Sequence, residues 1–489
     1  MQWYASADSL IQAVTRSMAR RAGTPFKVGR LLLVVERSLA IALGAWAWGI
    51  CCIHAVAAAE DKVVVEIEEA ITNYTNPNNG SGPLWCYGAP LLVRRGKEVF
   101  LSVMETGKEV PPLCNTRWQL WRRTDGGWRL VQHEADFRER EPCPLGGLQE
   151  GRLFLSVNPS LSPPGTSYGG VCDPQLLQFD MRDPGAAPNI LHPLWAEGTR
   201  FTEHSYRGLA VDAKNNALLM LNIHPEGHYF PTFRDRDGKW HPLQIIRFPI
   251  RACYPEVVLR GRSAHVLAIG DIVEPVKEWR ELKFQVLKRE WDYVFRRLFY
   301  TYSPDVTRTP FAPPVEIDSV ENTAGHISNL DLYVDSRGRA HVLYDKQSHQ
   351  YAFLRDKFFP GQPISVSLIH AVLDGGKVIS SQVLLENVEG SKEMAPGWGR
   401  FHVTPGGRLY VIFYATWTDK EGKSHADNLL MALGSGSSKR TAVPLGLKRP
   451  LQSFFTNTTR GGSEPSRILD LFGVGADAYT LRYARLRFE

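Results

Sequence analysis

The chain has 489 residues, of which 43% are hydrophobic and 22% are charged, and its formal net charge is +6. This composition is typical of a globular protein with a buried core, so disorder is excluded as the main state. Several of the basic residues, including Arg20, Arg21 and Arg30, lie near the N-terminus. The rest of the chain has no concentrated run of Lys and Arg, so we expect no nucleic-acid partner.

The first 59 residues have the organisation of a signal peptide. A basic segment precedes an apolar run over residues 38–53, and the triplets 55–57 and 57–59 fit the small-residue rule for cleavage. The run of about 16 residues is shorter than the roughly 20 that a spanning helix needs. We predict cleavage near Ala59, a secreted or periplasmic protein, and no membrane span after cleavage. An uncleaved anchor is the alternative.

The body of the chain repeats one pattern, in which a short apolar strand, a polar turn and a second apolar strand follow one another. The turns lie at residues 94–97, 150–151, 212–216, 260–262, 335–339, 404–407 and 473–477. Such periodicity indicates a repeat architecture, and most units continue with further strands, as the four-stranded blades of a β-propeller do. In the third unit, residues 244–248 are predicted to form such a further strand. A spare strand at residues 63–67 is available to complete the last blade.

We therefore predict an all-β fold, a seven-bladed β-propeller that occupies residues 60–489 as one domain and is closed by its N-terminal strand. Two unrelated β domains are the alternative, but no Pro/Gly/Ser-rich linker divides the body. Residues 274–291 have apolar positions near helical spacing, which predicts one amphipathic helix inserted in the fourth blade. That helix is expected to act as a lid over the ring or, alternatively, to dock a partner or a membrane surface.

In a β-propeller, the functional site lies at the end of the ring where two kinds of loop meet. One kind leads into the innermost strand of a blade, and the other leaves its second strand. Imidazoles exchange protons near neutral pH, and arginines bind carboxylates through paired hydrogen bonds. On this rule we predict the catalytic residues His204, Tyr206, His326 and Tyr229. The predicted substrate-binding residues are Arg207, Arg400, Glu105, His224 and Asn329. Internal ion pairs between blades are the alternative role for the two arginines.

We expect no cofactor and no metal. The chain contains no serine-hydrolase elbow, zinc-protease motif, phosphate-binding loop or dinucleotide fingerprint. His224 and His228 are separated by a Pro and a Gly, so they do not share a helical face as a paired zinc site would.

Residues 332–344 (LYVDSRGRAHVLY) and 209–212 (LAVD) carry a family resemblance. With the other hairpins, they resemble secreted sialidase-like propellers of the BNR-repeat type. The resemblance implies a seven-bladed propeller whose relatives include glycosidases, polysaccharide lyases and non-catalytic binders. Sialidases use an arginine cluster, to which Arg207 and Arg400 would correspond, but the chain lacks their Asp-box spacing.

Two functions follow as hypotheses. The first is an exported, monomeric enzyme that acts on acidic polysaccharides or oligosaccharides. A lyase would use His204 or His326 as base, Tyr206 or Tyr229 as acid, and Arg207 or Arg400 to bind the uronate carboxylate. A hydrolase would need two carboxylates, for which Glu105, Asp271, Asp331 and Asp345 are candidates. Histidines and tyrosines outnumber credible carboxylate pairs, which favours the lyase. The second hypothesis is a non-catalytic propeller that binds glycan or protein.

Overall fold

The computed structural model describes residues 62–86, 88–163, 166, 170–202, 206–290, 292–434, 441–477 and 479–489. The predicted signal peptide and the predicted catalytic residue His204 lie outside the described residues. No helix in the described part of the chain is long and apolar enough to cross a membrane.

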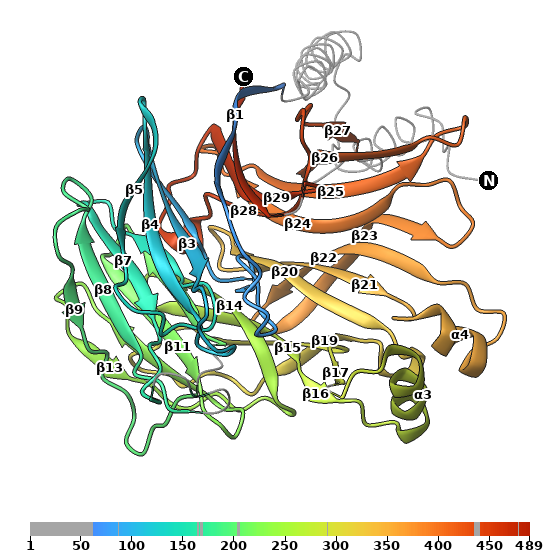
Figure 1. Cartoon of the computed structure of the whole chain (residues 1–489), viewed down its shortest axis with the longest axis horizontal. Coiled ribbons are helices and arrows are strands. Elements are labelled where there is room, and N and C mark those ends of the chain that lie inside the picture. Colours follow the sequence, from blue (N-terminus) through green and yellow to red (C-terminus); the bar gives the residue numbers. More distant parts are fainter. Residues whose placement is uncertain are drawn as a thin grey trace, which may run out of the picture. The chain divides into compact units, whose positions relative to one another are not determined.

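Seven four-stranded antiparallel sheets follow one another along the chain (Figure 1). Blade 1 contains β2 (Leu92–Arg95), β3 (Glu98–Thr106), β4 (Thr116–Thr124) and β5 (Gly127–His133). Blade 2 contains β6 (Leu145–Gly147), β7 (Arg152–Val157), β8 (Gln175–Asp180) and β9 (Asn189–Leu191). Blade 3 contains β10 (Gly208–Asp212), β11 (Ala217–Ile223), β12 (Tyr229–Arg234) and β13 (Trp240–Pro242).

Blade 4 contains β14 (Ala252–Arg260), β15 (Ser263–Gly270), β18 (Arg297–Ser303) and β19 (Val315–Ser319). Blade 5 contains β20 (His326–Val334), β21 (Ala340–Gln347), β22 (Ser365–Asp374) and β23 (Lys377–Val388). Blade 6 contains β24 (Ala395–Val403), β25 (Leu409–Thr418), β26 (Ser424–Leu433) and β27 (Ala442–Pro444). Blade 7 contains β28 (Leu451–Thr456), β29 (Ile468–Gly475), β30 (Thr480–Phe488) and β1 (Val63–Asn73).

The burial of a strand depends on its place in the blade. Every residue of β11 is buried, because adjacent blades cover both faces of the inner strands. The outermost strand of blade 5, β23, is largely exposed. Packed apolar clusters fill the spaces between blades, and the one between blades 5 and 6 includes Leu343, Leu368 and Phe413. The core is thus a ring of interfaces between blades.

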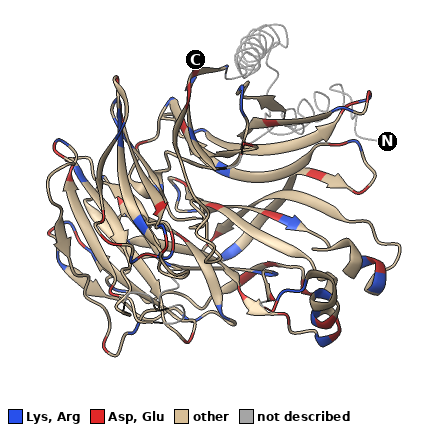
Figure 2. Cartoon of the chain, in the orientation of Figure 1, with Lys and Arg blue, Asp and Glu red and all other residues tan. Residues whose placement is uncertain are grey.

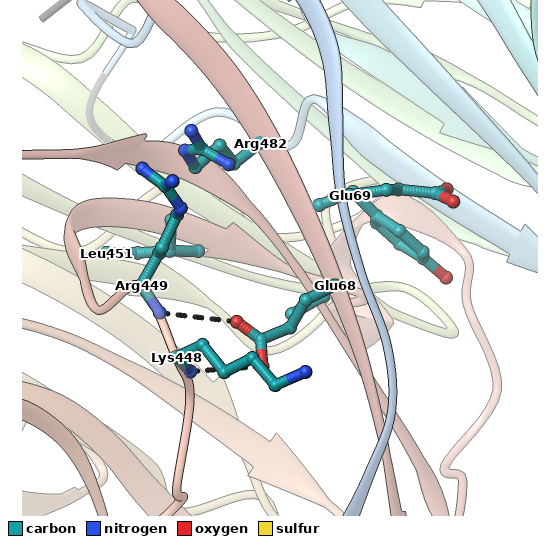
Figure 3. A pocket seen from close by; sticks show the side chains of 8 residues that line it. Glu68, Glu69, Lys448, Arg449, Leu451 and Arg482 are labelled. Carbon is teal, nitrogen blue, oxygen red and sulfur yellow. Dashed lines mark hydrogen bonds between the residues drawn. The ribbon is translucent and has the colours of Figure 1, made fainter. Parts of the chain in front are cut away.

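Blade 7 combines both ends of the described chain. β1 pairs with β30 in an antiparallel register that runs from Val63–Phe488 to Asn73–Thr480. The side chain of Glu68 accepts hydrogen bonds from the backbone nitrogens of Lys448 and Arg449, at 3.0 and 3.3 Å (Figure 3). These contacts fix β1 to the segment that leads into β28.

A helical insertion interrupts blade 4 between β15 and β18. It consists of β16 (Ile272–Val273), α3 (Lys277–Leu287) and β17 (Tyr293–Val294). The Trp279 ring of α3 lies 5.7 Å from the ring of Phe359, just beyond α4 (Ala352–Phe358) in blade 5. α3 lies at the edge of the ring beside α4 in Figure 1, and its surface carries both acidic and basic residues (Figure 2).

One predicted strand is wrong. Residues 244–248 were expected to extend blade 3, but they contribute only an isolated bridge between Ile246 and Tyr229. The outer strands of this blade are β12 and β13, which a tight turn at Gly238 (φ +85°) connects. That turn begins directly after β12, so the polypeptide reverses before it reaches residue 244.

A buried charge network lies where the inner strands of blades 4 to 7 meet. Asp331 of β20 accepts a hydrogen bond from Arg460 Nη2 at 2.6 Å and another from the Phe401 backbone nitrogen at 2.8 Å. Arg460, in the short helix η2 (Thr459–Gly461), also donates to the carbonyl of Gly88. A Cβ at Gly88 would lie 1.8 Å from Cγ of Glu256, so only glycine fits this close approach.

Glu256 in this network makes stability depend on pH. Burial raises the pKa of its carboxyl from 4.5 to about 8. The folded chain thus holds a proton that the unfolded chain releases, and this stabilisation is complete below about pH 4.5 and is lost as pH rises through about 8. We expect Glu256→Gln to flatten the fall in the urea midpoint between pH 6 and pH 9. An unchanged slope would contradict this assignment.

Candidate functional site

Aromatic side chains from several blades meet at the end of the ring where chains enter the innermost strands. The Tyr254 ring of β14 lies 4.9 Å from Tyr206, 5.9 Å from Trp85 and 6.0 Å from Phe295. Phe295 in turn lies 5.7 Å from His326, the first residue of β20. We call these five residues the Tyr254 ring cluster. Their sequence separation shows that only the propeller brings them together.

The backbone of Tyr254 is strained. Its φ is +50°, a left-handed conformation that aromatic residues rarely adopt, and the following Pro255 disfavours it further. The strand pairing of β14 with β15 is irregular at this point, between Cys253 and Glu256. Bulges and strained residues of this kind concentrate near functional sites, where they aim a side chain in a required direction.

His326 is the member of the cluster that is able to take up a proton. Burial, together with the nearby charges of Arg296 and Lys283, lowers its pKa to about 4, so the imidazole is uncharged at neutral pH. Nε2 lies 3.3 Å from Ser328 Oγ, and Nδ1 has no hydrogen-bond partner among the described residues. An uncharged imidazole with an unpaired nitrogen is suited to act as a base.

The insertion in blade 4 fixes the cations beside His326. Arg296 binds both oxygens of Glu274, at 2.9 and 2.6 Å, and also donates to the carbonyl of Gly325 at 3.3 Å. Lys283 of α3 reaches the same carboxylate at 3.3 Å. All three charged side chains of this group are at least 97% buried. α3 therefore contributes, through Lys283, one of the positive charges that lower the pKa of His326.

Arg251 provides a partly exposed cation at the same end of the ring. Its guanidinium lies 5.3 Å from the centre of the Tyr206 ring and 5.4 Å from that of Tyr293. Nη1 binds Asp271 at 2.5 Å, and the other guanidinium nitrogens have no hydrogen bonds to described residues. Such a side chain is able to bind a carboxylate or sulfate while it remains oriented by the two rings.

A buried carboxyl lies behind His326. Ser328, whose hydroxyl contacts the imidazole, donates its backbone N–H to Asp345 at 3.1 Å. Burial raises the pKa of Asp345 to about 6. The chain His326–Ser328–Asp345 therefore links a nitrogen base to a carboxyl group that takes up a proton in mildly acidic solution.

The fold has known counterparts. A polysaccharide lyase of family PL25, an ulvan lyase bound to a saccharide of glucuronate and sulfated rhamnose, superposes with a TM-score of 0.51 at 11% identity, over 85% of this chain and 95% of that one. A second structure of a PL25 ulvan lyase gives a TM-score of 0.50 at 10% identity, with the same coverage. A fungal α-L-arabinanase from Penicillium chrysogenum, complexed with arabinobiose, gives 0.39 at 10% identity, over 86% of this chain and 98% of that one.

At these identities the similarity establishes the seven-bladed propeller fold. No protein-family model matches the chain, and no curated protein matches it significantly.

Two of the predicted catalytic residues, Tyr206 and His326, belong to the Tyr254 ring cluster, where the rings of Tyr254 and Phe295 lie between them. The third described one, Tyr229, lies in the core. Its hydroxyl donates to the carbonyl of Ala252 at 3.1 Å, and its side chain is fully buried. Burial raises the pKa of both tyrosines well above 10, so both hydroxyls keep their protons at neutral pH.

The two predicted arginines make internal contacts. Arg207 lies 3.2 Å from Glu139 and donates to the carbonyl of Pro142. Arg400 donates to the carbonyls of Leu330 and Phe454 and packs over two aromatic rings. Both arginines are at least 96% buried. Their contacts agree with the alternative role, in which they hold blades together.

The other predicted substrate-binding residues are dispersed. Asn329 is buried and donates to the carbonyl of Tyr254 at 2.8 Å, which ties blade 5 to the strained residue of the ring cluster. Glu105 is bound by Arg117 at 2.8 Å and by Gln119 at 2.6 Å in blade 1. His224 lies in the turn between β11 and β12, 5.6 Å from the Phe230 ring.

Sequence reasoning missed a pair of acidic residues in the segment between β5 and β6. Burial and the neighbouring charge of Glu139 raise the pKa of Glu134 to about 8. Glu139 is itself 99% buried and accepts a hydrogen bond from the Asn158 backbone at 2.7 Å. Residues 134–141 (EADFRERE) contain many charged side chains, which could have indicated a functional segment. Charged runs are usually exposed to solvent, however, so this segment was not selected.

Among the described residues, Cys86, Cys143 and Cys253 are thiols that form no disulfide. No group of three or more His, Cys, Asp or Glu residues in the described ranges is arranged to hold a metal ion.

Proposed function

We propose that the chain is an exported enzyme that cleaves an acidic polysaccharide by β-elimination at the Tyr254 ring cluster. The observation that carries the proposal is His326, an uncharged imidazole whose buried Nδ1 has no hydrogen-bond partner among the described residues and whose ring contacts Phe295. Aromatic rings with a few convergent polar groups are the usual lining of sugar sites. The similarity in fold to an ulvan lyase supports the same substrate class.

In this elimination, His326 takes the proton at C5 of the uronate ring. The electron pair of that C–H bond forms the C4–C5 double bond, and the bond between C4 and the glycosidic oxygen breaks. The departing oxygen then takes a proton from an acid. Tyr206 is the candidate acid, because it belongs to the ring cluster, whereas Tyr229 is fully buried in the core. Arg251 is the candidate partner of the uronate carboxylate.

The low pKa of His326 also fits an anionic substrate. Burial lowers this pKa most, and the positive charges of Arg296 and Lys283 lower it further. A bound carboxylate near the imidazole opposes those charges and raises the pKa, so the histidine becomes a stronger base when substrate is present. A neutral sugar does not have this effect.

The test is an incubation of the protein with uronate-containing polysaccharides, followed by absorbance of the unsaturated uronate and by assay of new reducing ends. We expect absorbance to rise with an acidic substrate and to stay flat with a neutral arabinan. Binding without cleavage on any substrate would instead support the non-catalytic propeller.

Two further assignments accompany this function. We propose that residues 1–59 are a cleaved signal peptide, so N-terminal sequencing of the exported protein should find Glu60 first; Met1 or Met18 would contradict cleavage. We also propose a relationship to sialidase-like propellers of the BNR-repeat type, which the hairpin at residues 332–344 supports.

A further inference from the structure

A cavity opens between blades 5 and 6, on the same end of the ring as His326. Its volume is about 570 Å³, within the range of small-molecule sites. It is lined by the loop that leads into β24 and by the turn that joins β25 to β26. These are the same two kinds of loop that carry the Tyr254 ring cluster, so the cavity and the cluster lie on one side of the propeller.

Trp417 points into this cavity from blade 6. Side chains alternate along β25, and Phe413 and Ala415 belong to the apolar cluster that packs against Leu330 and Leu343 of blade 5. The same alternation directs Trp417, two residues farther on, toward blade 5. Here the lining of the cavity changes from the apolar core to the polar residues Ser391, Lys392 and Glu393 of the loop before β24.

Neighbouring side chains of the same cavity wall hold the Trp417 ring in place. His425, its cross-strand partner, stacks on it at 5.4 Å with an angle of 15° between the rings. Asp419 binds His425 Nε2 at 2.6 Å, and this hydrogen bond lowers the pKa of Asp419. The indole is thus oriented by a ring and a carboxylate although it stands at the rim of the core.

The facing wall offers polar groups. Asn387 Nδ2 donates to Ser391 Oγ at 3.1 Å and to the carbonyl of Glu393 at 2.6 Å, which shapes the loop. Lys392 of this loop is exposed and supplies a cation at the cavity, whose lining also includes the carboxylates of Glu393 and Asp419. A fixed aromatic face opposite hydroxyl, amide and ammonium groups matches the two sides of a sugar ring, one apolar and one polar.

We propose that the Trp417 cavity is an accessory subsite that binds a sugar unit of an acidic glycan, with the sugar stacked on Trp417 and its anionic group near Lys392. The subsite rests on the proposed function for its ligand class. Blade 5 contributes both His326 and the loop with Lys392, so a polysaccharide that crosses this blade would contact both places. The subsite would hold the chain at a distance from the bond that is cleaved.

The test compares binding of a glucuronate–rhamnose sulfate oligosaccharide to the whole protein and to Trp417→Ala, by calorimetry in the His326→Ala background so that no cleavage occurs. Loss of the stacking ring should raise Kd about tenfold. Trp417→Phe should retain most of the affinity, and Tyr479→Ala, which removes an exposed ring elsewhere, should not change it.

The outcomes separate the subsite from the proposed function. An unchanged Kd for Trp417→Ala, or no binding to the protein at all, would overturn the subsite. If the wild-type protein binds the oligosaccharide through Trp417 but never cleaves it, the subsite stands and the proposed lyase activity fails. If it cleaves and Trp417→Ala leaves KM unaltered on long chains, the activity stands and the subsite fails.

Discussion

Replacing Arg460 by methionine is expected to lower the free energy of unfolding by about 3–5 kcal/mol. The substitution removes the partner of Asp331, a 2.6 Å contact between side chains that are at least 98% buried. Asp331 would then be left charged and unpaired among blades 5, 6 and 7. Urea unfolding at pH 7, followed by tryptophan fluorescence, measures the change.

Two companion variants test the cause. Asp331→Asn added to Arg460→Met should recover much of the lost stability, because it removes the unpaired charge and keeps an acceptor for the Phe401 nitrogen. Arg487→Ala, which breaks the exposed ion pair with Glu66, should cost less than about 1 kcal/mol. Equal losses for Arg460→Met and Arg487→Ala would contradict the structural role of the network.

Replacing His326 by alanine is expected to lower kcat by about 10²–10⁴-fold, the usual contribution of a general base. KM should change little, because the rings and Arg251 remain. The wild-type kcat/KM should fall as pH drops through about 4, since protonation of the imidazole in the free enzyme removes the base.

His402 is the matched control for His326. It is also a histidine with a pKa near 4, but it is buried and binds the carbonyl of Ser466 at 2.8 Å. His402→Gln should affect stability more than kcat in the folded fraction. If His326→Ala retains full kcat, or if both variants lose activity in proportion to lost folding, His326 is not the base.

The fold was largely accessible from the sequence because each blade carries its own local signal. The strand–turn–strand units place apolar residues and turn residues at short range, so no distant contact has to be known. Residues 244–248 show the limit of this approach. Their apolar pattern resembled a strand, but the turn at Gly238 had already completed blade 3.

The site was less accessible because its geometry depends on distant partners. Tyr206 and His326 could be predicted from the sequence as site residues, because both lie where the chain enters the innermost strand of a blade. Tyr254 and Arg251 were not, because a strained strand residue and a ring-stacked arginine leave no local pattern. The partner of Arg207 is Glu139, 68 residues earlier, and sequence spacing could not distinguish that ion pair from a substrate clamp.

The mass of the products released from a uronate-containing polysaccharide tests the proposed elimination most directly. Elimination by His326 predicts oligosaccharides with an unsaturated uronate at the non-reducing end, each lighter by one water than a hydrolysis product. These products should be lost with His326→Ala. Saturated products only, or no products from any acidic polysaccharide, would contradict the proposed function.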